Sequence, residues 1–340
     1  MNTATQNAFQ KRPKLLLLVG YGLATVCLFW VLHDFHMGRV LHDLANISWA
    51  WVVLGMTCDV ASYGFQALRW KFLLAPFGKV RLGRAIRAVY AGIFANLVFP
   101  LRPGEVLRSY LLANSEEISI GRTLGTVGVE RFVDLVVATA ALAMASLYLD
   151  LPRQDQRVAD WLAYVTLFLL FLVGLLILYI EIKLTRNAPV DGKKAHLPGK
   201  FMAVLTDLHA IGTSPSFYAA VLTSMAIPFC QVLGLWAVTR GFGLHPPLPL
   251  LASAVVLLII NLGVSLPNAP ANIGSYQAFC VLGLKVFNVD GDSATALSFF
   301  AFLALTIPLA FLGFAALLRS GMSFSTMREK VRGLPSRPRA

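Results

Sequence analysis

The most constraining feature of this sequence is residues 91–110, where charged side chains and helix-breaking residues interrupt an apolar segment. The polar residues of this segment include Asn96, Arg102, Glu105 and Arg108. A charge at the centre of a bilayer costs about 2.5 to 3.5 kcal/mol on insertion scales, so these residues need a buried or water-lined place. Broken backbone at membrane depth has the same need. We therefore predict a re-entrant helical hairpin that lines a polar cavity, with Pro100 and Gly104 as its hinge.

Composition supports a polytopic membrane protein. The chain is 57% hydrophobic and only 14% charged, whereas charged residues approach a quarter of a soluble domain. The net charge of +12 lies in short clusters between apolar segments. That layout is typical of membrane loops and argues against nucleic acid as a partner. Histidine and cysteine spacings match no metal motif, and no Walker sequence is present, so we expect no metal and no cofactor.

The distribution of arginine and lysine predicts the topology. Six apolar segments read as full spans, at 15–32, 49–68, 124–149, 160–180, 215–239 and 293–318, while 85–101 and 249–266 adjoin proline-rich breaks. The positive-inside rule places both termini and the basic loops at 69–87, 102–123 and 181–214 in the cytoplasm. The segment between the first two of these loops must then enter and leave by one face. By the same reasoning, the segment at 249–266 enters from the opposite face.

The predicted fold is therefore an all-α membrane protein with six full transmembrane helices and two opposed re-entrant hairpins. Residues 1–320 form one membrane domain with inverted halves at about 49–149 and 215–318, followed by a basic cytoplasmic tail at 321–340. The second hairpin has Pro267, Pro270 and Gly274 as its hinge. Inverted repeats with interrupted segments mark transport sites near the midplane. The alternative is two proline-kinked helices in an ordinary bundle.

Two charged groups form the candidate site. Arg102, Glu105 and Arg108 recur every three residues, as a ladder on one helix face. A second group follows at Glu130, Arg131 and Asp134, in which Arg131 and Asp134 are three residues apart and can pair. In these two groups three arginines would balance the charges of three carboxylates. Arg69 would then remain free to bind an anionic ligand. We expect a lipid phosphate at Arg69, Arg102 and Arg108, because guanidinium groups bind phosphate oxygens in pairs. Two alternatives stay open: Arg69 with Trp70 as an interfacial anchor, and the other charges as a buried network that touches no ligand.

The second hairpin offers polar but uncharged candidates for substrate binding, namely Asn268, Asn272 and Gln277. Amide groups suit a sugar, a glycerol unit or a water-lined path, but they could equally satisfy one another at the proline breaks. Asp59 in the second span is either a proton-coupling acid or a carboxylate that is simply neutral or paired.

These motifs resemble the lysylphosphatidylglycerol synthase transmembrane, or flippase-like, family. The likeness is carried by Arg69-Trp70, by Asn96 to Arg108, by Glu130-Arg-Phe-Val-Asp134, and by Pro267-Asn-Ala-Pro-Ala-Asn-Ile-Gly274 with Gln277. Ala271 stands where the family has a glycine. The resemblance implies paired hairpins between inverted halves and a role with aminoacylated phospholipids, glycolipids or polyprenyl phosphates. The aminoacyl-transfer domain of the multidrug-resistance member is not expected here.

From these observations the leading expectation is a lipid flippase or a transporter of a lipid-linked headgroup, not driven by ATP, in a cell inner or plasma membrane. Its partners would be a phosphate-bearing lipid at the site and anionic lipids at the basic loops; a homo-oligomer stays open. An intramembrane lipid-modifying enzyme with Glu105 or Glu130 as general base ranks second. An accessory protein of envelope lipid or glycolipid biosynthesis ranks third.

Overall fold

The computed structural model describes residues 20–33, 47–100, 102–148, 164, 168, 171, 199–244, 246–265 and 269–320. Within these residues the chain is all-helical and has no strand. The expected span at 160–180, the N-terminal residues before 20 and the tail at 321–340 lie mostly or wholly outside the described part. The principal helices are α3 (Trp49–Leu74), α4 (Leu82–Val98), α5 (Gly104–Glu116), α6 (Ile120–Tyr148), α8 (Gly199–Gly212), α9 (Pro215–Phe242), α10 (Leu250–Ser265), α11 (Ser275–Val286) and α12 (Gly291–Arg319).

Among the described helices, α9 and α12 are both long enough and apolar enough to cross a membrane, and the Gly20–Leu32 helix and α10 are shorter apolar helices. Helices α3 and α6 have 26 and 29 residues. At about 1.5 Å per residue, each is longer than the roughly 30 Å core of a bilayer. They are less apolar because they carry charged residues of the candidate site, of which Arg69 on α3 and Glu130 on α6 are buried against other helices.

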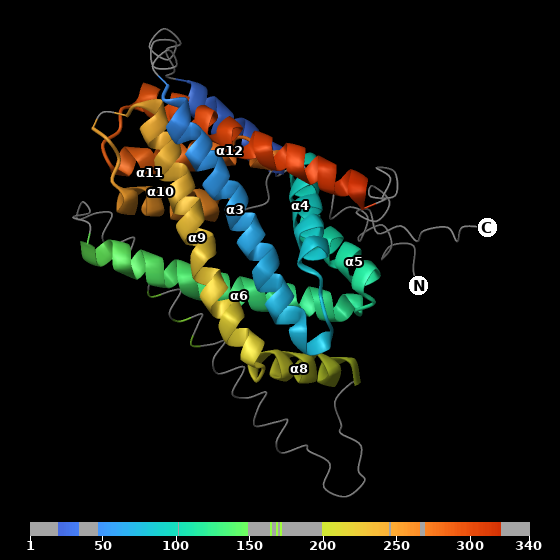
Figure 1. Cartoon of the computed structure of the whole chain (residues 1–340). Coiled ribbons are helices and arrows are strands. Elements are labelled where there is room, and N and C mark those ends of the chain that lie inside the picture. Colours follow the sequence, from blue (N-terminus) through green and yellow to red (C-terminus); the bar gives the residue numbers. More distant parts are fainter. Residues whose placement is uncertain are drawn as a thin grey trace, which may run out of the picture.

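Helices α3 and α9 form the antiparallel centre of the molecule and lie side by side in Figure 1. The amide of Ser48 donates to the Gly241 carbonyl at 2.9 Å, at one end of the pair. Further along, a Cβ on Gly55 would lie 2.7 Å from the Gly234 carbonyl oxygen. Small residues at this crossing let the two backbones approach closely, as in membrane helix pairs.

Helices α4 and α5 fold back on each other as a helical hairpin. At the turn, the Asn96 side-chain oxygen accepts from the Gly104 amide at 2.7 Å. At the open end, Glu116 accepts from the Arg81 amide at 2.8 Å and pairs with Arg84 at 2.9 Å. Polar contacts therefore hold the hairpin at both ends. At the open end they join the first turn of α4 to the last residue of α5.

Helices α10 and α11 form the second hairpin. Its turn contains the short 3-10 helix η2 (Pro270–Asn272); Pro267 and Asn268 lie outside the described residues. Ala271 and Asn272 have φ of 57° and 58°, in the left-handed region. Gly274 has φ of 89°, and a Cβ there would lie 2.5 Å from the Ala24 carbonyl oxygen in the Gly20–Leu32 helix. The N-terminal helix therefore covers this turn.

The two hairpins open at opposite ends of the α3–α9 pair and meet at their turns. The first follows the end of α3, and the second follows the end of α9, which runs the other way. A guanidinium nitrogen of Arg102, in the first turn, donates to the Val264 carbonyl near the end of α10 at 3.1 Å. Helix α4 also contacts η2. In Figure 1, α6 and α12 pass along opposite sides of this central assembly.

Candidate functional site

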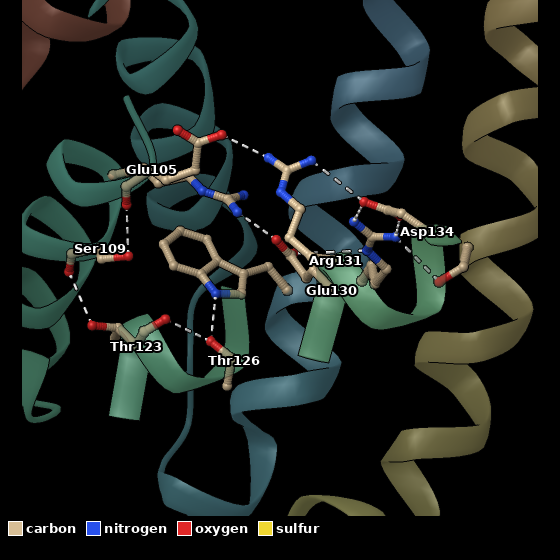
Figure 2. Close-up of polar contacts among 11 residues, drawn as sticks. Glu105, Ser109, Thr123, Thr126, Glu130, Arg131 and Asp134 are labelled. Atoms are coloured by element: carbon tan, nitrogen blue, oxygen red, sulfur yellow. Dashed lines mark hydrogen bonds and ion pairs between the residues drawn. The ribbon is translucent and has the colours of Figure 1, made fainter. Parts of the chain in front are cut away.

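A chain of ion pairs joins α3, α5 and α6 beside the centre of the molecule (Figure 2). The carboxylates are Glu105, Glu130 and Asp134, and the guanidinium groups are Arg69, Arg108 and Arg131. The three negative charges equal the three positive charges, so the cluster is neutral as a whole. Charges are tolerated away from water when they are paired in this way, although Arg69 Nε, Arg108 Nη1 and Glu130 Oε1 are buried without a hydrogen-bond partner.

Arg69 is almost completely buried and lies between two carboxylates. Its side chain is 2% exposed, pairs with Asp134 through both terminal nitrogens, and has its Nε 3.7 Å from Glu130 Oε1. It also donates to the Ser224 hydroxyl of α9 at 3.4 Å. Glu130 and Asp134 are one helical turn apart on α6 and would repel each other. Arg69 supplies the cation that lets both face the same side.

Arg108 is the second buried cation. It pairs with Glu130 and lies over the Trp70 ring, 4.8 Å from its centre. The Trp70 indole donates to the Thr126 hydroxyl of α6 at 2.9 Å. The contact of a guanidinium with an aromatic face adds to the ion pair. These contacts fix α5 against both α3 and α6.

The other end of the chain of ion pairs is accessible. The side chains of Arg131, Asp134 and Glu105 are 53%, 38% and 24% exposed. Arg131 bonds to Glu105 at 2.6 Å and lies 3.7 Å from Asp134. The pairing of Arg131 with Asp134, expected from their spacing, is confirmed. An anion that reached this site would meet Arg131 first.

Arg102 stands apart from this cluster. No carboxylate of the described residues lies within ion-pair distance of it, and its Nε is buried without a hydrogen-bond partner. It adopts φ of 52° before α5 begins, so the expected ladder of Arg102, Glu105 and Arg108 on one helix is wrong. Only the last two share α5, where they bond to different residues of α6.

Two expectations about Arg69 are therefore corrected. Of Arg69, Arg102, Arg108 and Arg131, it is Arg102 and not Arg69 that has no carboxylate of the described residues within ion-pair distance, because α3 brings Arg69 directly between Glu130 and Asp134. The interfacial-anchor alternative for Arg69 and Trp70 is also wrong, since both are buried and α3 continues beyond them to Leu74. Binding of phosphate by Arg69 or Arg108 would require either to leave its carboxylate.

The other predicted residues lie at the two turns. Asn96 closes the first turn through the Gly104 amide, and Pro100 stands in the connection. In the second turn, Gln277 is 1% exposed and accepts from the Gly274 amide at 2.7 Å, which makes it a cap of α11. Asn272 is partly exposed in the same turn. The structure thus brings these residues to one region, where Asn96 and Gln277 hold backbone in place.

Sequence reasoning missed Ser224 and Thr126, whose hydroxyl oxygens accept hydrogen bonds from Arg69 and Trp70. Serine and threonine are ordinary in apolar helices, where they bond to the preceding turn, as the Ser224 hydroxyl does to Ala220 at 2.8 Å. No local signal in the sequence marks these two residues.

A cavity of about 360 Å³ lies at the open end of the second hairpin, between Pro246–Pro249 and Phe287–Ser293, and none of the six paired charges lines it.

Comparison with known proteins identifies the family to which this chain belongs. A family model described as the lysylphosphatidylglycerol synthase transmembrane region matches residues 17–313. The chain is 28% identical over 211 residues to the UPF0104 membrane protein MJ1078 of Methanocaldococcus jannaschii, covering 60% of this chain and 84% of that one. It is 22% identical over 300 residues to the UPF0104 membrane protein MJ1595 of the same organism, covering 83% and 88%.

A third relative is larger than this chain. The glycosyltransferase AglD of Haloferax volcanii is 23% identical over an alignment of 293 residues that covers 76% of this chain and 47% of that protein. The family match covers most of the present sequence and includes both hairpins and the charged cluster. The predicted resemblance is confirmed: this chain is a membrane protein of the lysylphosphatidylglycerol synthase transmembrane-region family.

Proposed function

We propose that this protein is a flippase, or transporter, for a phosphate-bearing lipid or lipid-linked headgroup, and that it is not driven by ATP. The observation that carries the proposal is Arg102, a cation with a buried and unpartnered Nε where the turns of the two hairpins meet. A guanidinium without a carboxylate suits a phosphate oxygen. Arg131 lies in the accessible part of the neighbouring cluster and would guide the headgroup there.

The arrangement of the hairpins supports movement between the two faces. We interpret α3 to α6 and α9 to α12 as the halves of an inverted repeat, with each hairpin entering the membrane from its own side. In transporters of this kind, substrate binds near the midplane where interrupted segments meet. The headgroup would pass between the two turns while its acyl or prenyl chains stay in lipid. Both termini would lie in the cytoplasm.

Burial argues against the enzymatic alternative. A general base must reach the proton that it removes, but Glu130 is 1% exposed and one of its oxygens is bonded to Arg108. Glu105 is bonded to Arg131. The name of the Haloferax relative states a glycosyltransferase activity, but this chain matches less than half of that protein. Transport therefore ranks above lipid modification.

A flipping assay in proteoliposomes tests the proposal. Vesicles with fluorescent phosphatidylglycerol are treated with dithionite, and the protected fraction is followed in time. We expect Arg102→Ala to slow flipping about 10- to 100-fold, because a charge-assisted contact contributes about 1.5 to 3 kcal/mol. Arg87→Ala is the matched control, since Arg87 is an exposed arginine of the same hairpin. Equal rates for both variants, or no flipping above protein-free vesicles, would contradict the proposal.

A further inference from the structure

Asp59 is a buried acidic residue that the charged cluster does not use. It lies on α3 where that helix crosses α9, next to Gly234, and is 8% exposed. No described cation lies within ion-pair distance, and its carboxylate has no hydrogen bond among the described residues. An isolated carboxylate in apolar surroundings is strongly disfavoured as the anion. Asp59 therefore needs either a proton or a partner that arrives with a ligand.

Titratable groups surround Asp59 from several elements. Tyr63 lies one turn further along α3, the ring centre of Tyr90 on α4 is 6.4 Å from that of Tyr63, and Tyr276 on α11 packs against the same hydrophobic core as Met56 of α3. The Tyr90 hydroxyl is engaged, because it donates to the Val60 carbonyl at 2.7 Å. Helix α9 carries Cys230 between Tyr218 and Arg240 near its two ends, and α11 carries Cys280, with Lys285 in its last turn. Between its two ends, α12 has no titratable side chain.

Tyr63 links Asp59 to the proposed phosphate site. Tyr63 and Phe99 pack against the same hydrophobic cluster, which contains Leu107, and Phe99 and Leu107 flank the first turn, where Arg102 lies. The surroundings of Asp59 on α3 are therefore continuous with those of Arg102 in the first turn. A phosphate bound at Arg102 would add a negative charge to this poorly solvated region. Two anions that share such a region repel each other strongly because the effective dielectric constant is low.

We propose that Asp59 binds the proton that accompanies the headgroup, so that the protein is a symporter of a phosphate-bearing lipid and H⁺. This inference rests on the proposed function. Phosphate at Arg102 favours the neutral carboxylic acid at Asp59, and by reciprocity the protonated acid favours phosphate binding. The headgroup and the proton therefore bind together and cross in the same direction. The chemistry is only Asp59 COO⁻ + H⁺ → COOH, reversed on release.

Proton uptake on binding tests this inference. The protein in detergent is titrated calorimetrically with short-chain phosphatidylglycerol in two buffers of different ionisation enthalpy, which reports the protons taken up per ligand. For the wild type, we expect uptake to rise toward about one proton as the pH is raised and Asp59 becomes ionised before binding. Affinity should fall over the same pH range. Asp59→Asn, which mimics the neutral acid, should bind with no uptake and with affinity that no longer falls.

Two variants control this experiment. Asp59→Glu keeps a titratable acid and should restore proton uptake. Asp207→Asn removes a carboxylate of α8 that pairs at the surface with Arg122, and should behave as the wild type. Proton uptake that persists in Asp59→Asn would overturn the inference, as would wild-type binding without uptake at any pH.

An imposed pH gradient separates this inference from the proposed function. With the outside of the vesicles acidic, inward flipping of fluorescent phosphatidylglycerol by the wild type should accelerate several-fold, and Asp59→Asn should not respond. Wild-type flipping that needs Arg102 but ignores the gradient would leave the flippase intact and overturn proton coupling. No binding and no flipping by the wild type would overturn the proposed function and the coupling with it.

Discussion

At the scale of single residues, the buried charges explain one another. Arg69, Arg108 and Glu130 are all nearly inaccessible, and Glu130 is the residue that both arginines share. Removing one member of a buried ion group leaves the others charged and uncompensated, which is costly. Glu130 is thus the residue on which the stability of the cluster depends most.

Replacement of Glu130 tests this dependence. Glu130→Gln should lower the free energy of unfolding by about 3 to 5 kcal/mol, because two buried guanidinium groups lose their common carboxylate. Asp207→Asn disrupts an exposed pair with Arg122 and should cost less than about 1 kcal/mol. Denaturation of the purified variants in one detergent measures both. Similar losses for the two would show that water, and not pairing, stabilises the cluster.

The sequence predicted the members of this cluster better than their pairing. The spacing along the helix predicted the pairing of Arg131 with Asp134, and in the structure their charged groups are 3.7 Å apart. It could not predict Arg69 with Asp134, since these residues are 65 positions apart and no periodicity connects them. Because this long-range contact was not predictable, we expected Arg69 to be the arginine without a carboxylate, whereas in the structure it is Arg102.

At the scale of elements, glycine contacts set the shape of the first hairpin. A Cβ on Gly104 would lie 2.1 Å from the Gly92 carbonyl oxygen and 2.6 Å from the Asn96 side-chain oxygen. The backbone at Gly92 could not move away from such a Cβ without separating α4 from α5. The turn thus depends on the lack of a side chain at this position as much as on the bond from Asn96 to Gly104.

Alanine substitutions in the hairpin test that dependence. Gly104→Ala should destabilise the protein by about 1 to 3 kcal/mol through overpacking. Gly83 lies in α4 of the same hairpin, and a methyl group there would have nothing within 4 Å. Gly83→Ala should therefore stabilise by about 0.5 to 1 kcal/mol, because alanine favours helix over glycine. Thermal unfolding compares them. A Gly104→Ala protein as stable as Gly83→Ala would show that the turn can open.

Helix positions were more predictable than turns. Apolar periodicity and length placed most of the described helices to within a few residues, as for 215–239 against α9 at Pro215–Phe242, whereas α3 continues to Leu74, beyond the predicted end at 68. The turn conformations of Arg102, Ala271 and Asn272 were not predictable, because non-glycine residues rarely adopt positive φ and carry little local signal for it. Contacts between the two turns, such as Arg102 with Val264, accompany these conformations.

At the scale of the whole molecule, the antiparallel α3–α9 pair determines how the hairpins are placed. Each hairpin follows the end of one of these helices, so the two open at opposite ends and their turns meet between them. If each open end lies at its own face of the membrane, a headgroup can approach Arg102 from either side. That geometry is the basis of the proposed transport.

Cysteine accessibility measures this placement most directly. In a cysteine-free background, single cysteines replace Lys79 and Asn114 at the open end of the first hairpin, and Pro247 and Gly291 at that of the second; all four positions are exposed. An impermeant maleimide is applied to sealed vesicles of known orientation. The account predicts that positions 79 and 114 react from one side, and 247 and 291 from the other. Reaction of positions 79 and 114 from opposite sides would contradict it.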